Sequence, residues 1–155
     1  MKKLFFLYIM LSVLIFANCS NKETNEPKQD SVNHNYTFKD ENDMWAAEYK
    51  VVGTETFTEK DGLLDVETES NNELTVTYKG KLTALSSVKH MEISYESSTN
   101  GGKMINDYDK DECITSKAFI ISSGGKNCAI PSENDIIKVY INIDGVENML
   151  ELKNK

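Results

Sequence analysis

Apolar and polar side chains alternate with a period of two over most of the chain after residue 35. Successive side chains of a β-strand point to opposite faces, so this alternation is typical of strands that bury one face. No later segment shows a sustained helical stripe, and the short, serine-rich stretch from Lys81 to His90 is predicted to be a loop or a single turn. The faces expected to form the core are Trp45, Ala47, Tyr49 and Val51; Leu64, Val66 and Thr68; Leu74, Val76 and Tyr78; and Met91, Ile93 and Tyr95.

Seven or eight short strands over about 120 residues predict an all-β domain, an antiparallel two-sheet sandwich with immunoglobulin-like architecture. A small closed barrel is the alternative. The chain lacks the Cys–Trp–Cys spacing of true immunoglobulin domains, so only the architecture is predicted. Residues that favour turns separate the runs, and Ser122 to Gly125 is interpreted as a loop. The predicted turns are Gly53, Asp61-Gly62, Asn71-Asn72, Gly80, Asn100-Gly101-Gly102 and Gly124-Gly125.

The end of the chain contains the clearest local element, a predicted β-hairpin. Two strand-like segments flank Asp144-Gly145, and this dipeptide favours the positive φ angles of a type I′ turn. The turn fixes the register of the two strands, and this register places three apolar pairs on one face. These pairs are Ile143 with Val146, Val139 with Leu150, and Ile137 with Leu152.

The first nineteen residues have the layout of an export signal. Lys2 and Lys3 precede the apolar run Leu4 to Phe16, after which the chain becomes polar. A basic start, a short apolar stretch and a cleavage region define secretory signals. The thirteen-residue run would span about 20 Å as a helix, which is too short for a stable membrane span.

The run Ile15-Phe16-Ala17-Asn18-Cys19 resembles the lipobox of bacterial lipoproteins. The resemblance implies that the Cys19 thiol receives a diacylglyceryl group and that cleavage leaves this lipidated (palmitate-type) cysteine as the new N-terminus. Phe16 and Asn18 depart from the usual leucine and small residue at their positions. Two acyl chains suffice for stable membrane attachment. The implied location is extracytoplasmic, anchored to the bacterial cell membrane; an ordinary signal peptide or an uncleaved anchor is the alternative.

These features divide the chain into three parts. Residues 1–18 are the predicted signal peptide, with a signal helix; residues 19–35 are the lipidated cysteine and a flexible, disordered linker; residues 36–155 are the β-sandwich domain. The linker prediction rests on Ser20 to Asn35, where Val32 is the one apolar side chain besides Pro27. Such a segment buries too little surface to offset the entropy of ordering. His34 lies in it and is expected to be exposed.

Several segments of the predicted domain resemble a group of small lipoproteins of Gram-positive bacteria. That group has an early "NW…Y.V" segment, a strand ending in "YKG" and a closing "IKV…WDG" hairpin. The resemblance covers about 110 residues and implies no particular activity. The matching segments are Glu41 to Val51, Leu74 to Gly80, Ser122 to Gly125, and Ile137 to Val139 followed by Asp144-Gly145.

The charge of the chain limits its partners. The full chain carries a net charge of −8, and loss of Lys2 and Lys3 with the signal would leave 15 lysines against 25 acidic residues, or −10. Nucleic acids and anionic lipids are bound through basic surfaces, so the composition argues against both. The expected partners are the membrane, through the lipid anchor, and a protein or other envelope component.

Few residues are candidates for chemistry. Asp107, Asp109 and Asp111 have a spacing that could bind Ca²⁺, although an EF-hand fails because Glu112 and Ala118 occupy its glycine and glutamate positions. A solvated acidic loop is the alternative. Cys113 and Cys128 are a candidate disulfide outside the cytoplasm, or else two buried thiols. His34 and His90 are the only histidines, and no close-spaced pair of zinc ligands is present.

No pattern of a nucleophile with its base is present, so the chain is predicted not to be an enzyme and to need no cofactor. Tyr108 and Tyr140 are the better candidates for aromatic side chains on the surface. The sequence therefore favours a lipid-anchored binding or surface-interaction domain without catalysis. The alternative is an acidic inhibitor of a basic secreted enzyme such as lysozyme.

Overall fold

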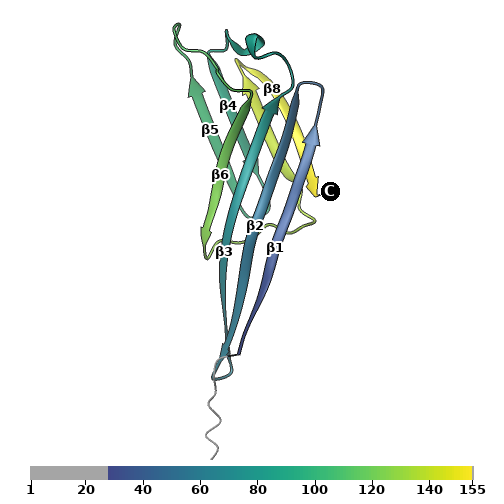
Figure 1. Cartoon of the computed structure of the whole chain (residues 1–155), viewed down its shortest axis with the longest axis vertical. Helices are drawn as coiled ribbons and strands as arrows, with labels where there is room; N and C mark the ends of the chain where they lie inside the picture. Colours follow the sequence, from purple (N-terminus) through teal and green to yellow (C-terminus); the bar gives the residue numbers. More distant parts are fainter. Residues whose placement is uncertain (1–27, 155) are drawn as a thin grey trace, which may run out of the picture.

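The computed structural model describes residues 28–154, which form an all-β antiparallel domain (Figure 1). The predicted signal, Cys19 and the first part of the expected linker lie outside the described residues. The strands are β1 (Lys28–Glu41), β2 (Trp45–Lys60), β3 (Leu63–Tyr78), β4 (His90–Glu96), β5 (Gly101–Asp107), β6 (Ala118–Lys126), β7 (Ile137–Ile143) and β8 (Val146–Asn154).

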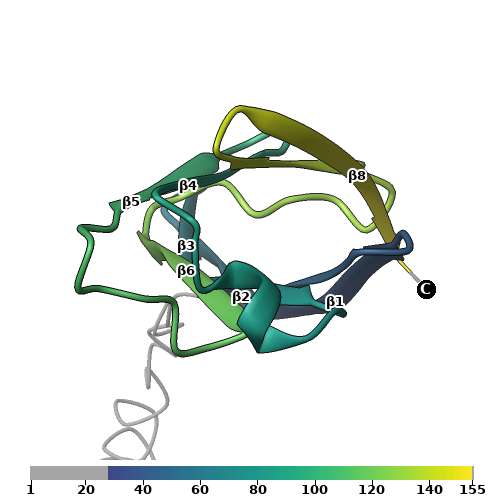
Figure 2. The ribbon, with the colours of Figure 1, turned by 90° about the horizontal axis from the view of Figure 1, so that it is seen from above.

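The eight strands form one sheet in the order β5-β4-β7-β8-β1-β2-β3-β6. This sheet curls until it is nearly closed into a barrel, as the view from above shows (Figure 2). Side chains bridge the seam between its two ends: the Tyr95 hydroxyl lies 2.7 Å from Ser123 Oγ, and Gly102 packs close to Ile121. The antiparallel all-β prediction is confirmed, whereas the immunoglobulin-like division into two sheets is not confirmed.

The core fills the inside of the barrel with the inward faces predicted from the alternation. Trp45, Tyr49 and Val51 on β2 are almost completely buried, as are Met91 and Ile93 on β4. Aromatic rings pack within this layer, with centroids 5.0 Å apart for Trp45 and Tyr78 and also for Tyr49 and Tyr95. Such tilted ring pairs add to the stabilisation from burial alone.

Two irregular segments cover the ends of the barrel. The short 3-10 helix η2 (Leu82–Leu85) and the residues after it bury Leu85 and Val88 at the upper end in Figure 1. The single turn predicted within Lys81 to His90 is therefore confirmed. At the lower end, the loop between β6 and β7 buries Pro131 and packs Ile130 against the core. No helix between residues 28 and 154 is long and apolar enough to cross a membrane.

Strands β1, β2 and β3 extend beyond the barrel as a three-stranded ribbon, made of residues 28–32, 55–60 and 63–68 (Figure 1). The pairing of β3 with β6 stops at Glu69, and β8 pairs with β1 only at Phe38 and Lys39. Six residues of β2 lie in the ribbon, which is therefore about 20 Å long. Its tip contains the β2–β3 turn and the start of β1, because Lys28 pairs with Glu59.

The ribbon corrects the prediction of a flexible linker. Residues 28–35 were expected to be disordered, but they form the first half of β1. They contribute few apolar side chains, and what orders them is continuous backbone pairing with β2 from Lys28 opposite Glu59 to Asn35 opposite Val52. Backbone hydrogen bonds satisfy the polar main chain whatever the side chains are, so composition alone misjudged this segment.

Three of the predicted turns are wrong because the strands continue through them. Gly53 lies inside β2, where a Cβ atom would be 2.7 Å from the Ile130 side chain, so close packing explains the glycine. Asn72 lies inside β3 and pairs with Val51 on one side and Ser123 on the other. Gly124-Gly125 lie inside β6, so the loop predicted for Ser122 to Gly125 is also wrong.

Two segments that were predicted as separate strands form the single strand β3, and one face that was predicted to be buried is exposed. Leu64 and Val66 were expected to be buried, but their side chains are 66% and 46% exposed. Both lie in the ribbon, below the level at which the barrel has an interior. Alternation identified the face correctly, but the barrel supplies no opposite layer to cover it.

The predicted C-terminal hairpin is confirmed in turn and in register. Asp144 and Gly145 have φ angles of 48° and 87°, as a type I′ turn requires. The three predicted apolar pairs are opposite one another in the β7–β8 ladder. Asp144 Oδ1 also accepts hydrogen bonds from the backbone N–H groups of Lys89 and His90, at 3.0 and 2.8 Å.

Replacement of Gly145 by valine is expected to destabilise the barrel by about 1–2 kcal/mol, because a β-branched residue is strained at positive φ. Nothing lies within 4 Å of the Cβ position, so backbone strain alone causes the loss. Gly62→Val is the matched control, since Gly62 has a φ of 75° in the same kind of turn but lies at the ribbon tip. Thermal unfolding should show a clear loss for Gly145→Val and a smaller one for Gly62→Val. A parent-like midpoint for Gly145→Val would contradict the assigned turn.

Candidate functional site

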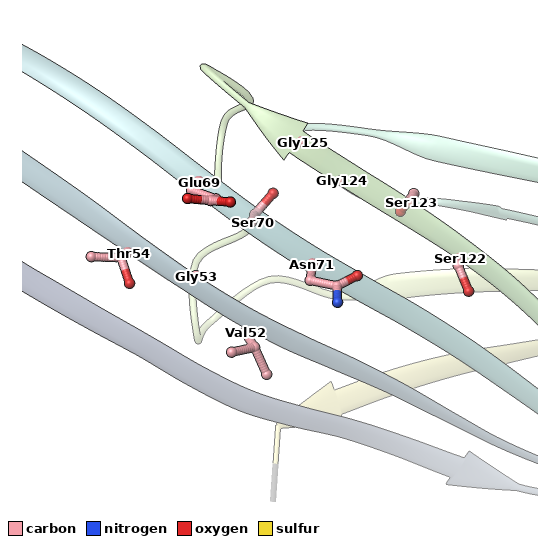
Figure 3. Close-up of a pocket in the computed structure, with 10 residues that line it drawn as sticks. All are labelled: Val52, Gly53, Thr54, Glu69, Ser70, Asn71, Ser122, Ser123, Gly124 and Gly125. Carbon is pink, nitrogen blue, oxygen red and sulfur yellow. The ribbon is translucent and has the colours of Figure 1, made fainter.

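The outer face of β2, β3 and β6 carries a groove of about 610 Å³ (Figure 3). It lies where the barrel passes into the ribbon, so its walls are three paired strands and not mobile loops. A site on paired strands keeps its geometry before a ligand arrives, which lowers the entropy lost on binding. The lining residues are Val52, Gly53 and Thr54 from β2, Glu69, Ser70 and Asn71 from β3, and Ser122, Ser123, Gly124 and Gly125 from β6.

Small residues on β6 create the hollow. Gly124 has a φ of 130°, and a Cβ atom there would lie 2.3 Å from the carbonyl oxygen of Ser70. A side chain at this position is therefore excluded, and β6 approaches β3 closely. The neighbouring outward position holds only the short side chain of Ser122, so β6 rises little above the sheet.

The groove offers neutral polar groups with one negative charge. The Thr54 hydroxyl donates to Asn33 Oδ1 at 2.9 Å, which fixes its orientation. Asn71 and Ser122 are exposed, and Glu69 is the one ionisable side chain among the lining residues. Hydroxyl and amide groups can both donate and accept hydrogen bonds, so this surface suits a polar ligand that is neutral or cationic.

Beneath the groove, the barrel interior contains a layer of buried polar groups. Tyr49 donates to Asn100 Oδ1 at 3.1 Å, and burial raises the pKa of the Tyr49 hydroxyl well above its usual range, so the hydroxyl stays protonated. Asn72 is completely buried, and neither polar atom of its side chain has a hydrogen-bond partner among the described residues. The same holds for Ser70 Oγ. Buried polar groups without partners reduce stability, so this layer is not explained by packing alone.

The two histidines occupy separate sites, and neither lines the groove. His34 pairs with Gly53 at the level of the groove, but its side chain lies on the inner face of the sheet. His34 was expected to be exposed, but its side chain is only 16% exposed. Its Nδ1 atom is 2.6 Å from the Tyr36 hydroxyl, and its Nε2 atom is 3.3 Å from Glu55 Oε2. The prediction was wrong because the segment around His34 is strand. His90 lies at the other end of the barrel, where Nδ1 is 2.6 Å from Asp107 Oδ1.

The candidate calcium residues are not gathered into a metal site. Asp107 contacts His90 at the end of β5, while Asp109 and Asp111 follow in the loop. Within residues 28–154, no cluster of three or more histidine, cysteine or acidic side chains is arranged to hold a metal ion. Residues 108–117 contain no strand or helix, and Asp109 and Asp111 are exposed there.

The candidate disulfide is also absent from the structure. Cys113 and Cys128 are both free and exposed, so neither the disulfide nor the alternative of two buried thiols is correct. Cys113 lies in the loop before β6 and Cys128 in the loop after it, so the strand itself separates the two thiols. Within residues 28–154, the Cys128 thiol has one hydrogen-bond partner, the backbone oxygen of Lys126, at 3.7 Å.

Tyr140 is a surface residue, as predicted from its position in the alternation. It is 39% exposed and donates to Glu96 Oε1 at 2.8 Å, and this hydrogen bond to a carboxylate raises its pKa. Tyr108 is half-buried and packs against the core, so it is a weaker surface candidate. Neither residue lines the groove.

Sequence reasoning missed the groove. The signal that could have revealed it was the run Ser122 to Gly125, whose small residues were interpreted as a loop. In a strand, the same run leaves a hollow between longer neighbours. The positions of Val52 and Asn71 beside it depend on the β2–β3–β6 register, which no local pattern specifies.

Comparison with known proteins adds no functional assignment to this geometry. No protein-family model, curated protein or solved structure matches the chain. The resemblance to small Gram-positive lipoproteins therefore remains a prediction from its motifs.

Proposed function

We propose that this protein is a lipid-anchored, extracytoplasmic binding protein that acts without catalysis. Its lipid is attached at Cys19, and the groove on β2, β3 and β6 binds a protein or another component of the cell envelope. The single observation that carries the binding proposal is the groove itself, a preformed hollow between three paired strands that is lined by both polar and apolar groups. A net negative charge favours such partners over nucleic acid.

The anchor proposal rests on the order of features along the chain. A basic start, an apolar run and a lipobox-like cysteine come first, and the first described residue of the domain, Lys28, is only nine positions after Cys19. The first described residue, Lys28, lies at the ribbon tip, and the barrel lies at the other end of the ribbon (Figure 1). An N-terminal lipid would thus hold the domain by its narrow end, with the groove accessible.

The proposal of a non-catalytic role is supported by the dispersion of reactive side chains. Each histidine contacts a different carboxylate, and neither histidine is among the residues that line the groove. Among the lining residues, Glu69 has no histidine beside it that could form a nucleophile–base pair with a groove serine. The polar side chains of the groove can nevertheless bind a ligand, because hydrogen bonds require suitably oriented donors and acceptors but no activated nucleophile.

Replacement of Cys19 by alanine is expected to move the protein from the membrane fraction to the soluble fraction, because the two acyl chains provide the attachment. Mass spectrometry of the parent protein should find a diacylglyceryl group on the N-terminal cysteine. The matched control is Cys128→Ala, which removes an exposed thiol elsewhere and should leave the protein in the membrane. An unmodified N-terminus on a freely soluble parent protein would rule out the anchor.

Asn71→Lys is expected to abolish partner capture by the groove, because a long cationic side chain would fill the hollow. The experiment uses the purified full-length lipoprotein to capture components of solubilised native envelope, which are identified by mass spectrometry. The control is Asn134→Lys, the same change at an exposed loop position outside the groove. Partners retained by Asn134→Lys but lost by Asn71→Lys are assigned to the groove. Equal capture by both variants would contradict the proposed binding site.

A second candidate function is inhibition of a basic secreted enzyme such as lysozyme. The observation that favours it is a row of exposed carboxylates on the outer face of β3, at Asp65, Glu67, Glu69 and Glu73. A row of one sign would attract a cationic partner, and salt would screen the attraction. Lysozyme activity should then fall on addition of the protein at low salt and recover at high salt. Full lysozyme activity at low salt with excess protein would eliminate this candidate.

A further inference from the structure

The ribbon tip exposes large apolar side chains that nothing in the described structure covers. Leu63 and Leu64, immediately after the β2–β3 turn, are 75% and 66% exposed. Val32 and Val66, farther up the ribbon, are 44% and 46% exposed. Single exposed apolar residues are common on protein surfaces, but a contiguous group at one end of a molecule marks an interaction site.

Strand register gathers most of these residues on one face. Val66 pairs with Phe57 of β2, which in turn pairs with Asp30 of β1. Leu64 and Val32 are even-numbered positions of the same strands, so they share this face with Val66 and with the partly buried Phe57. The face continues the inner wall of the barrel, but the core ends at Ile130, next to Gly53. Leu63 points to the other face, so the tip is apolar on both sides.

The sequence and the covalent geometry limit what can cover this tip. Nine positions separate Cys19 from Lys28, and the extended chain spans at most about 3.6 Å per residue, so Lys28 lies within about 32 Å of Cys19. The tip lies beside Lys28, because Lys28 pairs with Glu59 two residues before the turn. The intervening segment, Ser20 to Pro27, is SNKETNEP and has no apolar side chain other than proline with which to cover the leucines.

We propose that the ribbon tip is a second membrane contact, in which Leu63 and Leu64 enter the surface of the bilayer that holds Cys19. This inference rests on the proposed lipid anchor, because the anchor keeps the tip at the bilayer. Moving apolar side chains from water to the boundary between headgroups and acyl chains lowers their free energy. The anchor makes the second contact intramolecular, so a small apolar area suffices.

Charged residues limit the depth and the lipid preference of this contact. Glu59, Lys60, Asp61 and Asp65 flank the two leucines, and charged side chains stay at the level of the headgroups. Together with Lys28 and Asp30, the tip has four carboxylates against two lysines, so it is acidic. The contact is therefore shallow, and it is stronger on zwitterionic lipid than on anionic lipid.

Contact at both points would orient the domain. The ribbon is about 20 Å long, and the groove lies where the ribbon meets the barrel. A docked tip would therefore hold the groove about one ribbon length from the headgroups. A domain held only through the lipid at Cys19 would have no second contact to fix its orientation.

The test uses tryptophan fluorescence of the full lipidated protein in phosphatidylcholine vesicles that contain a spin-labelled quencher lipid. Leu63→Trp reports from the tip, and Val146→Trp is the matched control, because Val146 is 63% exposed beside a two-residue turn at the opposite end of the barrel. Trp45, the single native tryptophan, is 2% exposed and gives a constant background. The expected result for Leu63→Trp is a shift to shorter wavelength and loss of emission, greater with a shallow quencher than with a deep one.

Two further arms complete the test. Leu64→Asp in the Leu63→Trp protein should abolish the quenching, and phosphatidylglycerol in the vesicles should reduce it. Vesicle flotation and mass spectrometry of the N-terminal peptide report the anchor in the same samples. Protein that floats with its lipid but shows no more quenching at position 63 than at position 146 overturns the tip contact and leaves the anchor intact. Protein that lacks lipid and does not float overturns the proposed anchor and, with it, the tip contact.

Discussion

Strand β2 is paired with antiparallel neighbours on both edges along nearly its whole length, and the rest of the structure depends on this pairing. Its sixteen residues face β3 without a break, and all but the first and the last of them face β1. The first half of β2 contributes Trp45, Tyr49 and Val51 to the core. The second half leaves the barrel, and because both of its edges are satisfied it can project into solvent without unpaired backbone.

This arrangement places the two proposed functional surfaces on the same three-stranded unit. The groove lies where β6 stops adding a fourth strand, and the apolar tip lies where β1 begins and β2 turns into β3. The strands that connect them are continuous, so the distance between groove and tip is set by backbone geometry. The buried core stabilises the barrel. The ribbon is anchored in the barrel because its three strands continue into it without a break.

Sequence alternation predicted the inward faces of the barrel well, because each strand there has one buried and one exposed side. Trp45, Leu74 and Met91 all lie where their patterns placed them. The predictions were wrong at positions where a turn was inferred from the residue type alone. Gly53 and Gly124 were predicted to be turns, but Gly53 packs closely against the Ile130 side chain and Gly124 is required by its close contact with the Ser70 carbonyl. The groove was not predictable for the same reason, since its hollow exists only when β6 lies beside β3.

By itself, the sequence determined the antiparallel all-β class, the inward faces and the Asp144-Gly145 hairpin, because these depend on periods and turns within a few residues. Tertiary structure decided that the sheet is nearly closed into a barrel, that residues 28–35 belong to strand β1, and that Leu64 and Val66 remain uncovered. The physical reason is that strand order and register are pairings between distant segments. Whether an apolar face becomes core depends on what lies opposite it, and local sequence does not contain that information.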